Sequence, residues 1–204
     1  MLKASAQTAP GTTKGRIVEA ALETLKREGF AGTSARAIAA TGGFNQALIF
    51  YHFGSVDRLL LAALDETSAR RLEAYQAAVE KASSLEELVS VAARIYQEDL
   101  ASGQVTVLSE MIAGSLAHPD LGPEIAARIE PWVDFAEQVV TRVLGDTPFA
   151  SLIPSRDLAY AIVAFYLGLE QLSHLNGGTN RAAPLFDAAF RLVPLISPML
   201  AQGR

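Results

Sequence analysis

Hydrophobic residues recur every three or four positions along most of this 204-residue chain, which is the spacing of amphipathic helices. Breaks rich in glycine or proline separate these stretches, and no stretch alternates as a strand does. The pattern therefore predicts an all-α protein of about nine helices. Besides two short helices between residues 33 and 54, they are predicted at about Thr13–Glu28, Ser55–Ala82, Leu85–Ser102, Gln104–Ala117, Leu121–Leu144, Ser155–Leu175 and Ala183–Ala201.

Prolines fall inside two of the predicted helices. Pro131 lies within the stretch 121–144, and Pro194 and Pro198 lie within 183–201. Because proline lacks the amide hydrogen that a helix interior needs, we expect it to bend or divide each helix.

The two short helices are separated by a double glycine. Thr33 or Ser34 can cap the first, because a hydroxyl accepts a hydrogen bond from an otherwise unpaired amide at a helix start. Gly42-Gly43 ends it, since glycine enters the left-handed conformation at low cost. Asn45 can cap the second helix, and Phe44 can plug the intervening turn. This is the pattern of a helix–turn–helix.

In the second short helix, Ile49 and Phe53 lie one turn apart and are expected to face inward. Gln46, Ala47, Leu48 and Tyr51 then lie on exposed or half-exposed faces near its start. A helix–turn–helix presents this part of its second helix to the major groove of DNA.

Three sequence blocks carry a resemblance to a known family: I-V-E-A-A-L-E-T-L-K-R-E-G-F, T-S-A-R-A-I-A and G-F-N-Q-A-L-I-F-Y-H-F-G-S. In this order and spacing, residues 13–61 resemble the DNA-binding domain of the TetR family of transcriptional repressors. The remainder matches that family only in length and helical character. The resemblance implies a domain division of 1–12 as a flexible arm, 13–56 as the DNA-binding domain, and 57–204 as an effector-binding and dimerisation domain.

The resemblance also implies which residues contact DNA. They are Thr33, Arg36, Asn45, Gln46, Ala47, Leu48, Tyr51 and His52. Gln46 has an amide that can pair with adenine through two hydrogen bonds, and Arg36 can reach a guanine or a phosphate. Asn45 can cap the helix, contact DNA, or do both. The alternatives are that Tyr51 packs half-buried against the first helix and that His52 is an ordinary surface residue.

Two positions depart from the family pattern. Phe50 stands where a phosphate-binding tyrosine is usual, and Val56 stands where a lysine commonly follows the helix. Phosphate neutralisation dominates DNA affinity, so we expect weaker and less salt-dependent binding.

Charge is distributed unevenly along the chain. Residues 1–56 hold six basic and three acidic side chains, a net +3, so the remaining residues carry −8 of the total −5. A basic N-terminal part is typical of proteins that contact phosphates at one end, although chance gives a similar excess. Lys3 and Lys14 can contact DNA from the arm, or the arm has no role.

The sequence lacks the residues that several classes of function require. There are no cysteines, which excludes disulfides and thiolate sites, and the three histidines are scattered. We expect no metal site, cofactor, membrane span or secretion signal, and a cytoplasmic location. An enzyme remains the alternative, with Glu110, Glu170 and His174 as its only conceivable acid–base groups; a protein-interaction module is another.

The last two predicted helices carry broad apolar faces, which usually pack on both sides. A two-fold bundle between protomers would bury them, and a monomeric core is the alternative. The residues assigned to this dimer interface are Ala161, Phe165, Gly168, Leu172, Phe186, Ala189, Phe190 and Val193.

A few polar groups lie within otherwise apolar helices, and they suggest a pocket for a small apolar effector. The residues assigned to it are Tyr96, Glu110, Met111, Trp132, Phe135, Tyr166, Glu170 and His174. The alternative is that the carboxylates face water and the aromatic rings are core. Together these observations predict a homodimeric regulator that binds double-stranded operator DNA, and specifically a repressor that its effector releases.

Overall fold

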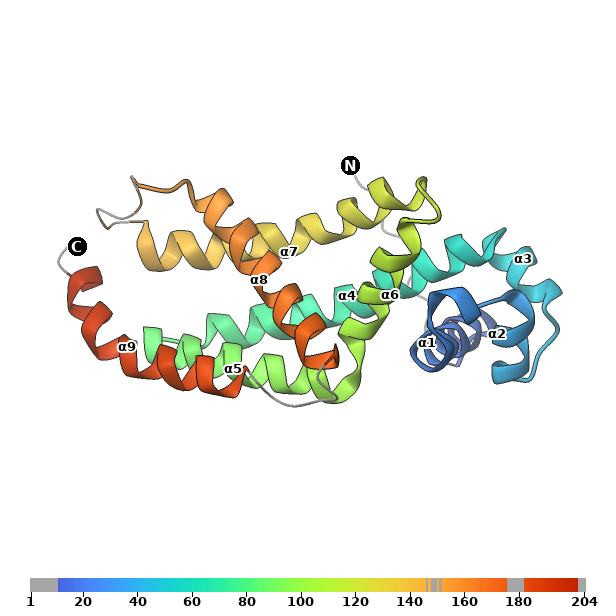
Figure 1. Cartoon of the computed structure of the whole chain (residues 1–204), viewed down its shortest axis with the longest axis horizontal. Helices are drawn as coiled ribbons and strands as arrows, with labels where there is room; N and C mark the ends of the chain where they lie inside the picture. Colours follow the sequence, from blue (N-terminus) through green and yellow to red (C-terminus); the bar gives the residue numbers. More distant parts are fainter. Residues whose placement is uncertain (1–10, 146, 148–149, 151, 176–181, 202–204) are drawn as a thin grey trace. The chain divides into compact units, whose positions relative to one another are not determined.

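A computed structural model of the chain describes residues 11–145, 147, 150, 152–175 and 182–201 (Figure 1). These residues form nine α-helices and no strand, which confirms the predicted all-α fold. The helices are α1 Thr13–Gly32, α2 Ala35–Gly42, α3 Ala47–Phe53, α4 Val56–Glu80, α5 Leu85–Ser102, α6 Gln104–Ser115, α7 Leu121–Leu144, α8 Ser155–Leu175 and α9 Ala183–Ala201. The predicted arm lies almost wholly outside the described residues.

The chain forms two compact units that interleave along the sequence. Residues 1–71 and 106–128 form the first, called the head here, and residues 72–105 and 129–204 form the second, called the body. The predicted division at residue 56 is linear, whereas α4 and α7 each contribute to both units and α6 lies mostly in the head.

The head is built around the packing of α1 on α2. Ile17, Leu25, Ile38 and Ile49 are completely buried and supply the apolar contact between the first three helices. At 25 cal/mol per Å² of apolar surface, each such side chain contributes roughly 1.5–3 kcal/mol to folding.

The helical conformation of α1 is interrupted at Gly29, next to its predicted end at Glu28. Gly29 adopts φ 69° and ψ 177°, and a further helical turn follows this kink before Thr33. The amide of Phe30 donates a 2.7 Å hydrogen bond to Oε2 of Glu110 on α6, 80 residues away. The kink exposes an amide that the helix itself would otherwise bond, and the Glu110 carboxylate satisfies it.

The Phe30 ring packs directly against Gly114 on α6, where any side chain would collide with the ring. A Cβ atom at Gly114 would lie 2.4 Å from the ring, and the ring makes an edge contact with His118 at a centroid distance of 5.4 Å. Glu110 and Gly114 lie one turn apart on α6, and His118 lies in the turn that follows the helix. Together these three residues hold the end of α1.

In the body, an ion-pair cluster joins the start of α8 to α7. The Arg156 guanidinium binds Asp134 at 2.5 Å and Glu137 at 2.9 Å, and it also binds Glu130. Its hydrogen bonds to Asp134 and Glu137 raise the pKa of Arg156 above its ordinary value. These groups are exposed, so the cluster orients the helices more than it stabilises them.

The prolines do not divide their helices. Helix α7 runs through Pro131, and α9 runs through Pro194 and Pro198. Each proline removes one amide donor and costs roughly 3 kcal/mol in a helix interior. Packing of the long helices, including α5 on α9, offsets this cost.

A substitution at Gly42 tests how tightly the helices of the head pack. A Cβ atom there would lie 2.2 Å from the Phe44 ring and 2.8 Å from Cβ of Ala20. We therefore expect Gly42→Ala to lower the free energy of unfolding by about 1–3 kcal/mol, measured by denaturant titration of circular dichroism. Gly122→Ala is the control, since nothing lies within 4 Å of the added methyl; equal stability loss in both variants would contradict this account.

Candidate DNA-binding surface and effector site

The turn between α2 and α3 is formed by the residues that the sequence indicated. Ser34 is the cap of α2, and its Oγ accepts a hydrogen bond from the amide of Ala37 at 3.2 Å. Gly43 ends α2 in the left-handed conformation with φ 66°. Asn45 Oδ1 accepts from the amide of Ala47 at 2.9 Å, so it satisfies an amide at the start of α3.

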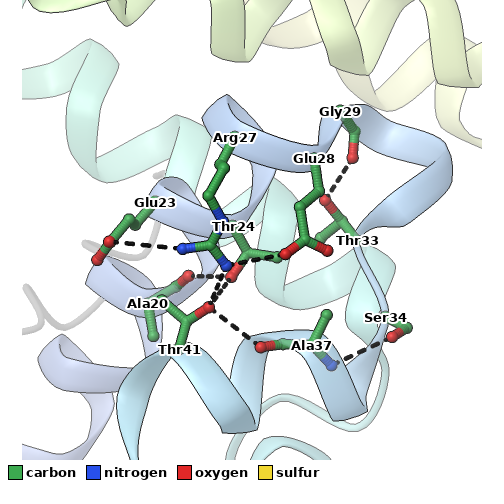
Figure 2. Close-up of polar contacts among 10 residues, drawn as sticks. All are labelled: Ala20, Glu23, Thr24, Arg27, Glu28, Gly29, Thr33, Ser34, Ala37 and Thr41. Carbon is green, nitrogen blue, oxygen red and sulfur yellow. Dashed lines mark hydrogen bonds and ion pairs between the residues drawn. The ribbon is translucent and has the colours of Figure 1, made fainter.

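A hydrogen bond between the hydroxyls of the buried Thr24 and the half-buried Thr41 joins α1 to α2, as Figure 2 shows. Thr24 Oγ1 lies 2.9 Å from Oγ1 of Thr41, and Thr24 also bonds the carbonyl of Ala20. Arg27 covers the pair: it donates to Thr41 at 3.0 Å and forms an ion pair with Glu28 at 2.8 Å. The α2–turn–α3 segment is therefore held in place by polar contacts as well as by its apolar core.

Most of the predicted DNA contacts lie on the surface. Arg36, Asn45, Gln46, Ala47 and Tyr51 are exposed, and Leu48 and His52 are half-buried. The Tyr51 side chain is 83% exposed, so the alternative in which it packs half-buried against α1 is wrong. The edge of its ring contacts His52 at a centroid distance of 4.9 Å, which orients both rings.

Thr33 has a different place from its neighbours. Its side chain is buried, and its hydroxyl donates a 2.6 Å hydrogen bond to the carbonyl of Gly29. The hydroxyl that was predicted to contact the DNA backbone thus stabilises the kinked end of α1. Its position just before the cap made its role ambiguous in the sequence.

The corner between α3 and α4 contains a basic residue, Arg58, that is not among the predicted DNA contacts. Ser55 Oγ accepts from the amide of Arg58 at 3.1 Å, so Ser55 caps α4. The exposed Arg58 side chain folds back toward α3, and its Nη1 would lie 3.5 Å from a Cβ atom at Gly54. Val56 itself is half-buried. The signal was available, because Arg58 follows the missing lysine position by two residues.

The predicted effector residues do not share one unit. Glu110 and Met111 belong to the head, where Met111 is completely buried and Glu110 binds Phe30. The other six belong to the body: Tyr96, Trp132, Phe135, Tyr166, Glu170 and His174. Glu110 was singled out because it is polar within an apolar helix, and its contact with Phe30 accounts for that polarity.

In the body, several of these side chains converge with residues that the sequence did not single out. Asp99 is buried, and it accepts hydrogen bonds from the hydroxyls of Tyr75 and Tyr166. The hydroxyls of Tyr96 and Ser173 are 2.7 Å apart. Helices α4, α5 and α8 thus meet through tyrosine hydroxyls.

Glu170 completes this cluster with a side chain that is only 3% exposed, which contradicts the alternative that it faces water. Trp132 lies beside Tyr75 with ring centroids 5.8 Å apart. The tyrosine–carboxylate site is defined here as Tyr75, Tyr96, Asp99, Trp132, Tyr166 and Glu170. Phe135 is half-buried, and the side chain of His174 lies outside the described residues.

An open groove of about 510 Å³ lies elsewhere in the body, between α4 and α5. Its walls are mainly alanine methyl groups, and its charged rim consists of Lys81, Glu87 and Arg94. Glu87 binds the amide and hydroxyl of Ser83, which lowers its pKa, and Arg94 pairs with Glu98. The groove shares no residue with the tyrosine–carboxylate site.

The described residues also bear on metal binding and on membrane insertion. No three His, Asp or Glu side chains there form a group that can hold a metal ion. No single helix in that part of the chain is long and apolar enough to cross a membrane, although α3 and α4, bent by 65°, pass the length and composition criterion together. Buried core helices satisfy the same criterion, so it carries little weight.

Comparison with known sequences agrees with this geometry. Residues 17–63, which contain most of α1, all of α2 and α3, and the start of α4, match the bacterial regulatory proteins, tetR family. The chain carries a TetR-family DNA-binding domain. No match is found among curated protein sequences.

Solved structures extend the likeness to the whole fold. The fatty acid degradation regulator FadR from Bacillus halodurans is 13% identical with a TM-score of 0.77, over 91% of this chain and 96% of that one. FadR from Bacillus subtilis in complex with stearoyl-CoA is 14% identical with a TM-score of 0.72, over 87% and 96%. The multidrug binding protein EbrR complexed with proflavin is 25% identical with a TM-score of 0.57, over 88% and 99%. The matched TetR family and neighbours such as FadR are regulators, not enzymes.

Helix α8 carries exposed apolar side chains along one face. Phe165 is 60% exposed and Leu172 is 59% exposed, and they continue the predicted stripe through Ala161 and Gly168. Exposed large apolar side chains that share one face are typical of interaction surfaces.

On α9, the predicted stripe faces inward. Val193 is only 7% exposed, and Phe186 packs on Tyr96 with ring centroids 5.6 Å apart; Ala189 and Phe190 are half-buried. The exposed large apolar residues of α9 are Leu185, Leu192, Leu195 and Ile196. This correction arises because α9 is apolar all round, so its periodicity alone does not identify the outer face.

Proposed function

We propose that this protein is a homodimeric transcriptional repressor that a small-molecule effector releases from a palindromic operator. The observation that carries the proposal is the exposed surface formed by Arg36, Gln46, Ala47 and Tyr51, held by a capped helix–turn–helix. That surface lies within the segment that matches the tetR family.

Each protomer would place α3 in a major groove. The two grooves would be one helical turn of DNA apart, about 34–36 Å between centres. Gln46 reads an adenine through its amide, while Ala47 and Leu48 offer apolar contact to thymine methyl groups. Arg36 and Arg58 supply charge for phosphates, and Arg58 offsets part of the charge missing at Val56.

The effector would bind in the body. The tyrosine–carboxylate site combines aromatic walls with few polar groups, which is the composition of a small-molecule site. The neighbours named with stearoyl-CoA and proflavin support a small-molecule ligand here too. Such a ligand shifts the protein from its DNA-competent state only if it binds another state more tightly.

An electrophoretic titration of the full chain on promoter DNA near its own gene tests the proposal. We expect a specific complex of dimer size at low salt, with competitor DNA of unrelated sequence leaving it intact. Absence of any specific complex under these conditions would refute DNA-binding regulation by this protein.

Substitutions that introduce charged side chains test the proposed dimer interface. Phe165→Glu combined with Leu195→Glu places carboxylates on the exposed faces of α8 and α9, and we expect monomers that lose operator binding because one head makes too few contacts. Size-exclusion chromatography with light scattering measures the mass. Leu116→Glu, at a head residue that is 88% exposed, is the control; dimers that persist in the double variant would place the interface elsewhere.

Specificity should depend on Gln46. We expect Gln46→Ala to cost about 1–3 kcal/mol against the preferred base and to relax discrimination at that one position. Binding to a set of single-base operator variants measures this. Gln97→Ala, on the exposed surface of α5 in the body, should leave every affinity unchanged. A uniform loss across all operators in Gln46→Ala would instead make Gln46 a backbone contact.

Salt dependence should report phosphate contacts at the α3–α4 corner. We expect Val56→Lys to strengthen binding to all sequences and to steepen the slope of log K against log salt by about one unit. Arg58→Gln should flatten that slope by a similar amount. Val56→Gln, which adds length without charge, is the matched control. If Val56→Lys changed neither affinity nor slope, residue 56 would not lie near the DNA backbone.

A further inference from the structure

Phe50 is an exposed aromatic residue of α3 to which the proposed function assigns no contact. Its side chain is 51% exposed, whereas its neighbour Ile49 is completely buried. Its carbonyl accepts a 3.0 Å hydrogen bond from the amide of Gly54, which ends α3, so the backbone that carries the ring is fixed in helical geometry. One exposed apolar side chain is ordinary, so its neighbours decide whether this ring belongs to a recognition surface.

The exposed side of α3 is formed by Gln46, Ala47, Phe50 and Tyr51. Gln46 has helical backbone angles, φ −55° and ψ −24°, and its carbonyl accepts a 3.1 Å hydrogen bond from the amide of Ile49. Gln46 therefore belongs to the first turn, and Phe50 lies one turn further along the same stripe. The ring is thus next to the amide that we propose reads adenine.

The residue types around Phe50 limit what its ring can contact on DNA. The sequence of α3 contains no lysine or arginine, and Arg36 and Arg58 lie on α2 and α4. A phenyl ring has no charge, donor or acceptor, so it gains nothing at a phosphate oxygen. An apolar part of DNA, by contrast, loses water when the ring covers it, and salt does not screen this gain.

Apolar groups are scarce on the base edges of the major groove, where the unmodified bases present only the C5 methyl group of thymine. Over any other base edge, the ring would displace water from polar groups without replacing their hydrogen bonds. A helix rises 1.5 Å per residue, so Phe50 lies about 6 Å from Gln46 along α3. Base pairs are stacked about 3.4 Å apart, so the ring reaches a base pair about one or two steps from the one at Gln46.

We propose that Phe50 reads the C5 methyl group of a thymine, about one or two base pairs from the adenine that pairs with Gln46. Phe50 is then a specificity-determining residue, and the ring replaces a contact to the DNA backbone with a contact to a base. The inference rests on the proposed function, since it names a base feature that the DNA-binding surface recognises.

Uracil substitution in the operator tests this contact with the unmodified protein. Each thymine of the specifically bound promoter fragment is replaced in turn by uracil, which removes only the methyl group and keeps the base pairing. We expect binding to weaken about three- to tenfold at a thymine close to the adenine on which Gln46 depends. Uniform tolerance of uracil at every position would overturn the proposal.

Phe50→Ala then assigns the methyl group to this side chain. The variant should bind the thymine operator about three- to tenfold more weakly and should no longer distinguish thymine from uracil at that position. The slope of log K against log salt should stay the same, because an uncharged ring releases no counterion. A thymine preference that persists in a folded Phe50→Ala protein would assign the methyl group to Ala47 or Leu48 and refute the role of Phe50.

Two further variants separate this contact from a general loss of apolar surface. Phe50→Leu keeps an apolar side chain and should retain part of the thymine preference. Leu116→Ala shortens a head side chain that is 88% exposed and lies outside the tetR match, and it should change neither the affinity nor the preference. Circular dichroism and the melting temperature establish that each variant is folded. Equal losses in Leu116→Ala and Phe50→Ala would contradict a contact specific to Phe50.

A methylated cytosine tests the same contact as a gain of affinity. 5-Methylcytosine carries its methyl group at the same place in the major groove but pairs with guanine. At the identified position, it should bind about three- to tenfold more tightly than cytosine does, and Phe50→Ala should remove the difference. Specific binding without any of these methyl effects would overturn this inference and leave the regulator intact, whereas absence of any specific complex would refute both.

Discussion

The hydrogen bond from the amide of Phe30 to the Glu110 carboxylate connects two distant parts of the sequence. It exists because Gly29 kinks α1 and leaves that amide without a helical partner. A buried amide without an acceptor costs about 1–3 kcal/mol, so the kink and Glu110 depend on each other. The glycine at position 114 completes the contact, because any larger residue would meet the Phe30 ring. Helix α6 therefore belongs to the head, although the sequence alone assigned it to the C-terminal domain.

The structure of the head could be predicted from its sequence because its signals are local. A serine cap, a glycine in the left-handed conformation and an asparagine at the next helix start each act within a few residues. Gln46 and Tyr51 could thus be placed on the surface from their spacing to the buried Ile49. Thr33 was the exception, because its hydroxyl bonds a carbonyl whose position depends on the kink at Gly29.

The candidate site in the body could be predicted only in part, because its contacts are long-range. Tyr96, Trp132, Tyr166 and Glu170 were identifiable as polar or aromatic residues on apolar helices. Asp99 and Tyr75 were not, since their pairing joins residues 24 positions apart on different helices. The apolar face of α9 was misplaced for a related reason: periodicity identifies one apolar face, but it does not tell a core from an interface when both sides are apolar.

The buried carboxyl groups of Asp99 and Glu170 carry a desolvation cost that lowers the stability of the body. Replacing them with apolar side chains of similar size would remove a desolvation cost and in many proteins increases stability. The body instead commits two tyrosine hydroxyls to Asp99 and encloses Glu170 between two interhelical hydrogen bonds. Stability alone does not account for this arrangement. The effector site proposed for the body would account for it, because a small-molecule site combines apolar walls with a few polar groups.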